Sequence, residues 1–124
     1  MREILFRGKR TDGVWEFGYY FAKPIQERHF ILCGENQWMV CKESVGQFTG
    51  LTDKNGKKIF EGDRCRVSRP CVLAYGKITF QNGCFWFVDD GPGGMLRLCD
   101  VKMNGFEIEV IGNIHDNPEL LENP

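Results

Sequence analysis

The sequence predicts a small, mostly β fold, built either as an SH3-like barrel or as a β-sandwich. Short alternating apolar segments recur along the chain, and Gly, Asn, Asp or Pro separates each from the next. The chain has 124 residues and 42% hydrophobic content, which is enough for one buried core. We therefore expect a single domain over residues 1–124, with an N-terminal β-hairpin region at 1–45 and a barrel-like region at 46–124. At most one short C-terminal helical turn is expected.

Residues 1–45 are expected to begin with a β-hairpin. Residues 1–9 alternate loosely between apolar and polar, Asp12-Gly13 is a favoured turn pair, and residues 14–21 form an aromatic, strand-like run. Pro24 ends this strand, because proline cannot donate a hydrogen bond to a β-ladder. Two further strands are predicted at 29–33 and 37–41, around a turn at 34–36.

The densest turn chemistry lies in residues 46–63. Asn55-Gly56 suits the positive φ of a tight hairpin, and Glu61-Gly62-Asp63 forms a second tight turn. Asp53, Glu61 and Asp63 could perform acid–base chemistry or hold a metal ion. Each also stands where a turn uses a carboxylate to accept backbone N–H groups, so turn roles are the expected ones.

Five strands are predicted in the C-terminal half, the first at residues 64–67, where Cys65 and Val67 alternate with two arginines. Residues 75–80 and 84–88 flank Gln81-Asn82-Gly83, which is the strongest hairpin signal in the chain. A mobile loop is expected at 89–94. Strands are then expected at 95–101 and 106–111, and Asp116 before Pro118 favours a single helical turn at 116–121.

Composition excludes several classes of protein. No apolar run is long enough to span a membrane, and the N-terminus lacks the apolar segment of a secretory signal. The six cysteines form no C-x-x-C pair and match no zinc module, so we expect reduced thiols, no metal and no cofactor. Cys65 has the apolar phase of a strand and is expected in the core.

Four stretches of the chain, in this order and at this spacing, resemble the sequence pattern of a known protein family. They read REILFRGK at residues 2–9, WEFGY at 15–19, GQFTGLTDKNGK with IFEGD at 46–63, and EVIGNIHDNPEL at 109–120. In these stretches the chain resembles the YopX family of small proteins encoded by phages, prophages and related mobile elements. The match is loose at residues 65–100, where members are expected to differ.

The resemblance implies a predominantly β protein in the cytoplasm of a bacterial host. It is compatible with a homo-oligomer, as is the excess of basic side chains in residues 1–70 and of acidic ones in 71–124. It implies no activity and supplies no catalytic residues. His29 and His115 also lack a partner at the spacing of a nucleophile–base pair.

Trp86 is the candidate protein contact. Phe85 and Phe87 share one face of their strand, and Trp86 has the other. If the two phenylalanines fill the core, Trp86 lies outside, where a rigid Trp is a favoured interface anchor. The alternative is that Trp86 lies beneath the loop at 91–94.

A basic group is the candidate nucleic-acid contact. It combines lysines of the central turn with two arginines that have the outward phase of the next strand: Lys54, Lys57, Lys58, Arg64 and Arg66. Basic side chains also protect exposed β edges from aggregation. The net charge of −1 argues against a dedicated nucleic-acid-binding protein.

Two functions follow from these candidates. The leading hypothesis is a non-enzymatic protein-binding module that acts on a host or phage protein, without a membrane. The alternative is a nucleic-acid-binding accessory protein that uses the basic group. An enzyme is not expected.

Overall fold

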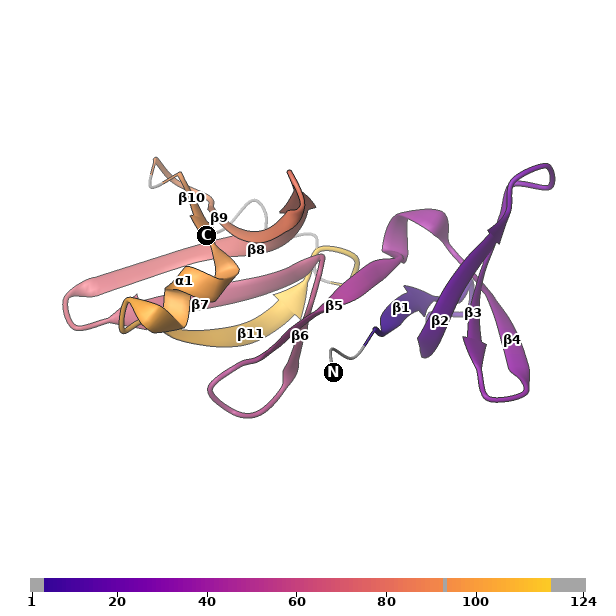
Figure 1. The fold of residues 1–124 in the computed structure, drawn as a ribbon, viewed down its shortest axis with the longest axis horizontal. Coiled ribbons are helices and arrows are strands. Elements are labelled where there is room, and N and C mark those ends of the chain that lie inside the picture. The colour runs from indigo at the N-terminus through magenta and orange to yellow at the C-terminus, as the bar shows by residue number, and fades with distance from the viewer. Residues whose placement is uncertain (1–3, 93, 117–124) are drawn as a thin grey trace. The chain divides into compact units, whose positions relative to one another are not determined.

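The computed structural model describes residues 4–92 and 94–116. The chain divides into two compact units, residues 1–50 and residues 51–124; the sequence-based division lay between residues 45 and 46. The strands form two antiparallel sheets, so the mostly β class is confirmed (Figure 1). Among the described residues neither sheet closes into a barrel, and the small β fold is consistent with the expected SH3-like barrel or β-sandwich.

The N-terminal unit is a meander of short strands. β1 (Phe6–Lys9) pairs with β2 (Trp15–Lys23), which pairs with β3 (Arg28–Cys33), and β3 pairs with β4 (Asn36–Val40). The short 3₁₀ helix η1 (Lys42–Ser44) leads into β5 (Gly46–Thr52), which lies against the free edge of β1. The predicted hairpin and the two strands after it are confirmed.

This N-terminal sheet curls on itself. The Cys41 N–H, just after β4, donates to Lys9 O at 2.9 Å, and the Lys9 N–H donates to Ser44 Oγ at 2.7 Å. A Cβ on Gly8 would stand 2.8 Å from Val40 Cγ2, so only glycine permits this approach. Inside the curl, Ile31 is fully buried, which identifies the inner face of the sheet.

The central stretch consists of two tight turns. β5 and β6 (Lys58–Phe60) are neighbours around residues 53–57, where Gly56 has φ 82° and the Asp53 N–H donates to Lys57 O at 2.8 Å. Gly62, with φ 92°, turns the chain into β7 (Asp63–Arg69). Both predicted turns are confirmed.

The C-terminal sheet has the strand order β10-β9-β8-β7-β11. β8 (Val72–Gln81) and β9 (Cys84–Asp89) join through Asn82 and Gly83, whose φ values of 53° and 77° are those of a type I′ turn. The predicted hairpin is thus confirmed. β11 (Glu107–Asn113) pairs with β7, with a register shift between Val110 and Gly112.

One face of this sheet forms the hydrophobic core. It is closed by a short helix, α1 (Leu98–Met103), which follows the edge strand β10 (Met95–Arg97). The buried core cluster comprises Ile59, Cys65, Val67, Ile78, Phe87, Leu98, Val101 and Ile108. The expected core position of Cys65 is confirmed, since its side chain is fully buried.

The predicted strand at 95–101 is wrong beyond residue 97. Leu98 and Val101 are three residues apart, so a helix places both on one side, where they are buried in the core. The helix ends at Asn104-Gly105, and Gly105 has φ 80°. The helical turn predicted at 116–121 falls almost wholly outside the described residues.

Candidate functional site

Asp53 is the centre of the first turn. Its Oδ1 accepts the Asn55 and Lys57 N–H groups at 2.8 and 2.9 Å, and its Oδ2 accepts the Val110 N–H of β11 at 3.0 Å. Burial alone would raise the pKa of this carboxyl, but the three backbone donors and the charge of Lys57 outweigh it and lower the pKa. Asp53 therefore shapes the turn and fixes it to β11.

Asp63 holds the second turn in the same way. Its buried Oδ2 accepts the Phe60 N–H at 2.8 Å. Beside it the Gly62 N–H donates to Ile78 O, and Gly62 O accepts the Ile114 N–H. The predicted turn roles of Asp53 and Asp63 are confirmed.

Arg64 was expected on an exposed strand face, and this expectation is wrong. Its side chain is only 1% exposed. Nη1 donates to Asp90 Oδ1 at 2.8 Å, and Nη2 donates to Oδ2 of the same carboxylate, so the pair is bidentate. The Asp90 N–H in turn donates to Tyr75 O at 3.0 Å, which anchors the loop after β9. A guanidinium this deeply buried needs its carboxylate partner, so Arg64 serves the fold.

The other members of the basic group differ in exposure. Arg66 is partly exposed, and its Nη2 donates to Glu109 Oε1 at 2.8 Å. Lys54, Lys57 and Lys58 are exposed together in the turn before and within β6. Of the five cations in the predicted basic group, three neighbouring lysines are therefore exposed, one arginine is partly exposed and ion-paired, and Arg64 is buried.

Trp86 lies where alternation predicted. Phe87 is buried and Phe85 packs against the core, so Trp86 is on the opposite side of β9. Its indole is half-buried, and Nε1 donates to Gln81 O at 2.9 Å. Thr79 of β8 and Arg97 of β10 flank it in register. Trp86 is thus held rigidly on the solvent side of the sheet.

Neighbouring apolar side chains extend this surface, which we call the outer face of the C-terminal sheet. Leu73 is 58% and Met95 45% exposed, and Tyr75 and Val88 are half-buried. All four have the same strand phase as Trp86. Sequence reasoning missed Leu73 and Met95. Leu73 could have been predicted to face outward, because Leu73 and Tyr75 alternate along β8 in the phase opposite to that of Ile78.

A hollow of about 720 Å³ opens in the N-terminal unit at the β2–β3 turn and the end of β4. Charges of both signs line it, from Glu27, Arg28, Lys42 and Glu43. His29 also faces it, but its Nδ1 is 2.7 Å from the Tyr20 hydroxyl, and the two rings stack. Apolar residues, among them Pro24, Met39 and Val40, make up the rest of its lining.

A second hollow, of about 260 Å³, lies along the core side of the C-terminal sheet between Val72, Phe87 and Phe106. It is mostly apolar, and Asp89 is its one acidic lining residue. The Asp89 Oδ1 accepts the Gly91 N–H at 2.7 Å, so this carboxylate also serves a turn.

Comparison with known proteins identifies the chain. A family model described as "YopX protein" matches residues 5–122, which is nearly the whole sequence. The chain belongs to the YopX family. A crystal structure of protein EF1440 from Enterococcus faecalis is similar over 98% of this chain and 99% of that chain, with a TM-score of 0.64 and 24% identity. At that identity the likeness shows the fold alone. No protein of curated function matches.

In this YopX family chain, the most specific stretch therefore encodes turns. Within residues 4–92 and 94–116, no group of three or more His, Cys, Asp or Glu side chains is placed to hold a metal ion. Nor does any helix in the described part of the chain have the length and hydropathy needed to cross a bilayer.

Proposed function

We propose that this YopX family protein is a non-enzymatic binding module that contacts a protein of its bacterial host or of the phage or prophage that encodes it. The observation that carries the proposal is the outer face of the C-terminal sheet. There Trp86 stands on a rigid strand among exposed and half-buried apolar neighbours. Rigid aromatic anchors within an apolar surface are the usual hot spots of protein interfaces.

The composition of this face favours a protein partner. Val88 and Met95 lie next to Trp86 on this face, and Tyr75 and Leu73 continue it along β8. Thr79 and Arg97 flank Trp86 in register, and Lys77 is in register with Val88. Aromatic residues, Met and Arg are the residue types enriched in protein interfaces, and this face presents all three.

The non-enzymatic part of the proposal is supported by what the acidic and histidine side chains already do. Asp53 and Asp63 accept backbone N–H groups, Asp90 pairs with buried Arg64, and His29 contacts the Tyr20 hydroxyl. General acids and bases need access to a substrate. These groups are instead engaged in holding turns, a loop and a strand pair.

The setting that we propose follows from family membership. The protein acts in the bacterial cytoplasm, without a membrane, and a homo-oligomer is compatible with its exposed apolar faces. A second candidate, a nucleic-acid-binding accessory protein that uses the basic group, is weakened by the burial of Arg64 and the ion pair of Arg66. Lys54, Lys57 and Lys58 are the residues that would carry it.

Affinity capture from host lysate, with and without nuclease, tests the proposal. The bait is the full chain, compared with Trp86→Ala and with Met103→Ala, a control that removes an apolar side chain 82% exposed on α1. We expect a protein that survives nuclease and is lost with Trp86→Ala but kept with Met103→Ala. Loss of all captured material after nuclease treatment would contradict the proposal and would indicate that the protein binds nucleic acid instead.

A further inference from the structure

The outer face of the N-terminal sheet is aromatic. On β2, Trp15, Phe17, Tyr19 and Phe21 alternate with residues that face the inner side of the curl. Tyr20 marks that inner side, because it is in register with fully buried Ile31 and its ring lies 5.7 Å from Phe6. The odd-numbered aromatic residues therefore point away from the interior.

The two neighbouring strands continue this surface, which we call the aromatic face. Phe30 of β3 is in register with Phe21 and with Met39 of β4, and Leu32 is in register with Tyr19. The Phe21 and Phe30 rings stack at 5.1 Å and 14°. Phe17 is 45%, Tyr19 65% and Met39 50% exposed. An exposed apolar area of this kind on a folded sheet marks a binding surface.

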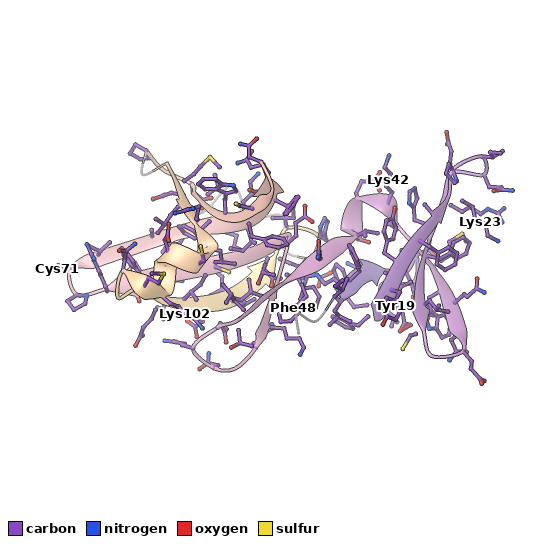
Figure 2. All side chains as sticks on the ribbon, viewed as in Figure 1. Tyr19, Lys23, Lys42, Phe48, Cys71 and Lys102 are labelled. Carbon is purple, nitrogen blue, oxygen red and sulfur yellow. The ribbon has the colours of Figure 1, made fainter. Side chains whose placement is uncertain are left out.

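Cations stand at both ends of the aromatic face. At one end Lys9 is in register with Trp15, with its Nζ 6.0 Å from the ring centre. At the other end is Lys23, which is labelled in Figure 2. It is in register with Arg28, and its Nζ lies 5.4 Å from the Phe30 ring. At the outward-facing positions of β1 to β4 the sequence contains no Asp or Glu.

This charge pattern indicates an anionic occupant with flat, stackable groups. Alternate residues of a strand are about 7 Å apart, a separation close to that of successive bases in an extended single strand. Proteins that bind single strands use such rows of rings for stacking and flanking Lys or Arg for the phosphates. A duplex offers no free base faces to Phe17 and Tyr19.

We propose that the aromatic face binds single-stranded nucleic acid, with bases stacked on Phe17 and Tyr19 and phosphates held by Lys9, Lys23 and Arg28. The net charge of −1 does not oppose this proposal, because a bound nucleic acid interacts with the local electrostatic field of the aromatic face. The site does not include Trp86 or the lysines of the central turn. This proposal can therefore be tested independently of the proposed protein contact.

Fluorescence anisotropy of a labelled oligothymidylate of about 12 nucleotides, titrated with the full chain, tests the site. Three phosphate contacts predict a slope of about −2 in log affinity against log salt. Tyr19→Ala should weaken binding by at least about 5-fold, and Lys23→Gln should make the slope shallower by about 0.7. Because Tyr19 is 65% exposed, its replacement is expected to leave the melting temperature unchanged.

Four controls distinguish binding at the aromatic face from binding elsewhere on the protein and from general attraction to anions. Lys57→Gln in the central turn and Trp86→Ala should bind the oligonucleotide like the wild type. A duplex of the same length should bind more weakly than the single strand. Vesicles containing phosphatidylserine should not compete with the oligonucleotide.

The proposal is overturned by an absence of binding at low salt, by equal affinity for the duplex, or by Tyr19→Ala binding at full strength. If Lys57→Gln lost binding and Tyr19→Ala did not, the contact would lie in the central turn, and the proposal would also be overturned. Binding to the vesicles without binding to the oligonucleotide would overturn it too, and would assign the face to an anionic lipid surface.

Discussion

At the scale of single residues, the carboxylates of the central stretch show how a motif that is specific to a family can encode turns. Asp53 accepts three backbone N–H groups, two within its own turn and one on β11. Local turn chemistry predicts the first two. The third joins residues 57 positions apart, and nothing local in the sequence indicates it.

Replacing Asp53 with Asn tests this role. Asn retains one acceptor oxygen but loses the charge and the second oxygen, so we expect a loss of about 1–3 kcal/mol in the free energy of unfolding. Urea denaturation at neutral pH measures it. An unchanged unfolding midpoint would show that the bonds of Asp53 contribute nothing net.

The pH dependence of Asp53 has a defined sign. Its pKa is lowered in the folded protein, so its stabilising contribution is complete above the ordinary pKa of an Asp and is lost as the pH falls through the lowered value. The stability gap between the wild type and Asp53→Asn should therefore shrink as the pH falls below the ordinary pKa of an Asp. A gap that widened on acidification would contradict the assignment.

Gly18 is a second residue whose role is set by backbone approach. A Cβ there would stand 2.1 Å from Leu32 O on the neighbouring strand. Gly18→Ala should therefore destabilise the N-terminal unit by about 1–3 kcal/mol. Gly91→Ala is the control, because its nearest contact would be a side-chain atom at 3.5 Å. Equal stability of the two variants would contradict the close approach.

At the scale of elements, strands and turns could be predicted where each signal is local. Asn82-Gly83 supplies the two positive φ values of its turn, and the hairpin forms around it. α1 could not be predicted this way, because Leu96 and Leu98 also fit a strand alternation. Packing in the core favours the helix over a strand, because the helix lets both Leu98 and Val101 pack against the sheet.

Leu98→Ala tests the packing of α1. Leu98 is 2% exposed, so truncation should create a cavity and cost about 2–5 kcal/mol in unfolding free energy. Met103→Ala on the exposed side of the same helix should change stability by less than about 0.5 kcal/mol. Similar small effects of both substitutions would mean that α1 adds little to the core.

At the scale of the whole molecule, the candidate site was only partly predictable. The outward direction of Trp86 follows from alternation along β9. The burial of Arg64 does not, because its partner Asp90 is 26 residues away in a loop that the sequence presents as mobile. Alternation on β7 gives the side of the sheet, whereas burial depends on what covers that side.

Thiol labelling tests the fold across the whole chain. Cys33, Cys41, Cys71 and Cys99 are exposed and unbridged, whereas Cys65 is buried in the core. Under native conditions a maleimide should label the exposed four and leave Cys65 unmodified until denaturant is added, as resolved by peptide mass spectrometry. Rapid native labelling of Cys65 would contradict its position.

The central claim is that this YopX family protein acts by binding a protein through the outer face of its C-terminal sheet. Oxidative footprinting of the captured complex tests this most directly, because Met and Trp are readily oxidised. The account predicts that oxidation of Trp86 and Met95 falls when the partner is bound, while that of Met103 stays the same. Unchanged oxidation of Trp86 and Met95 in the complex would contradict the claim.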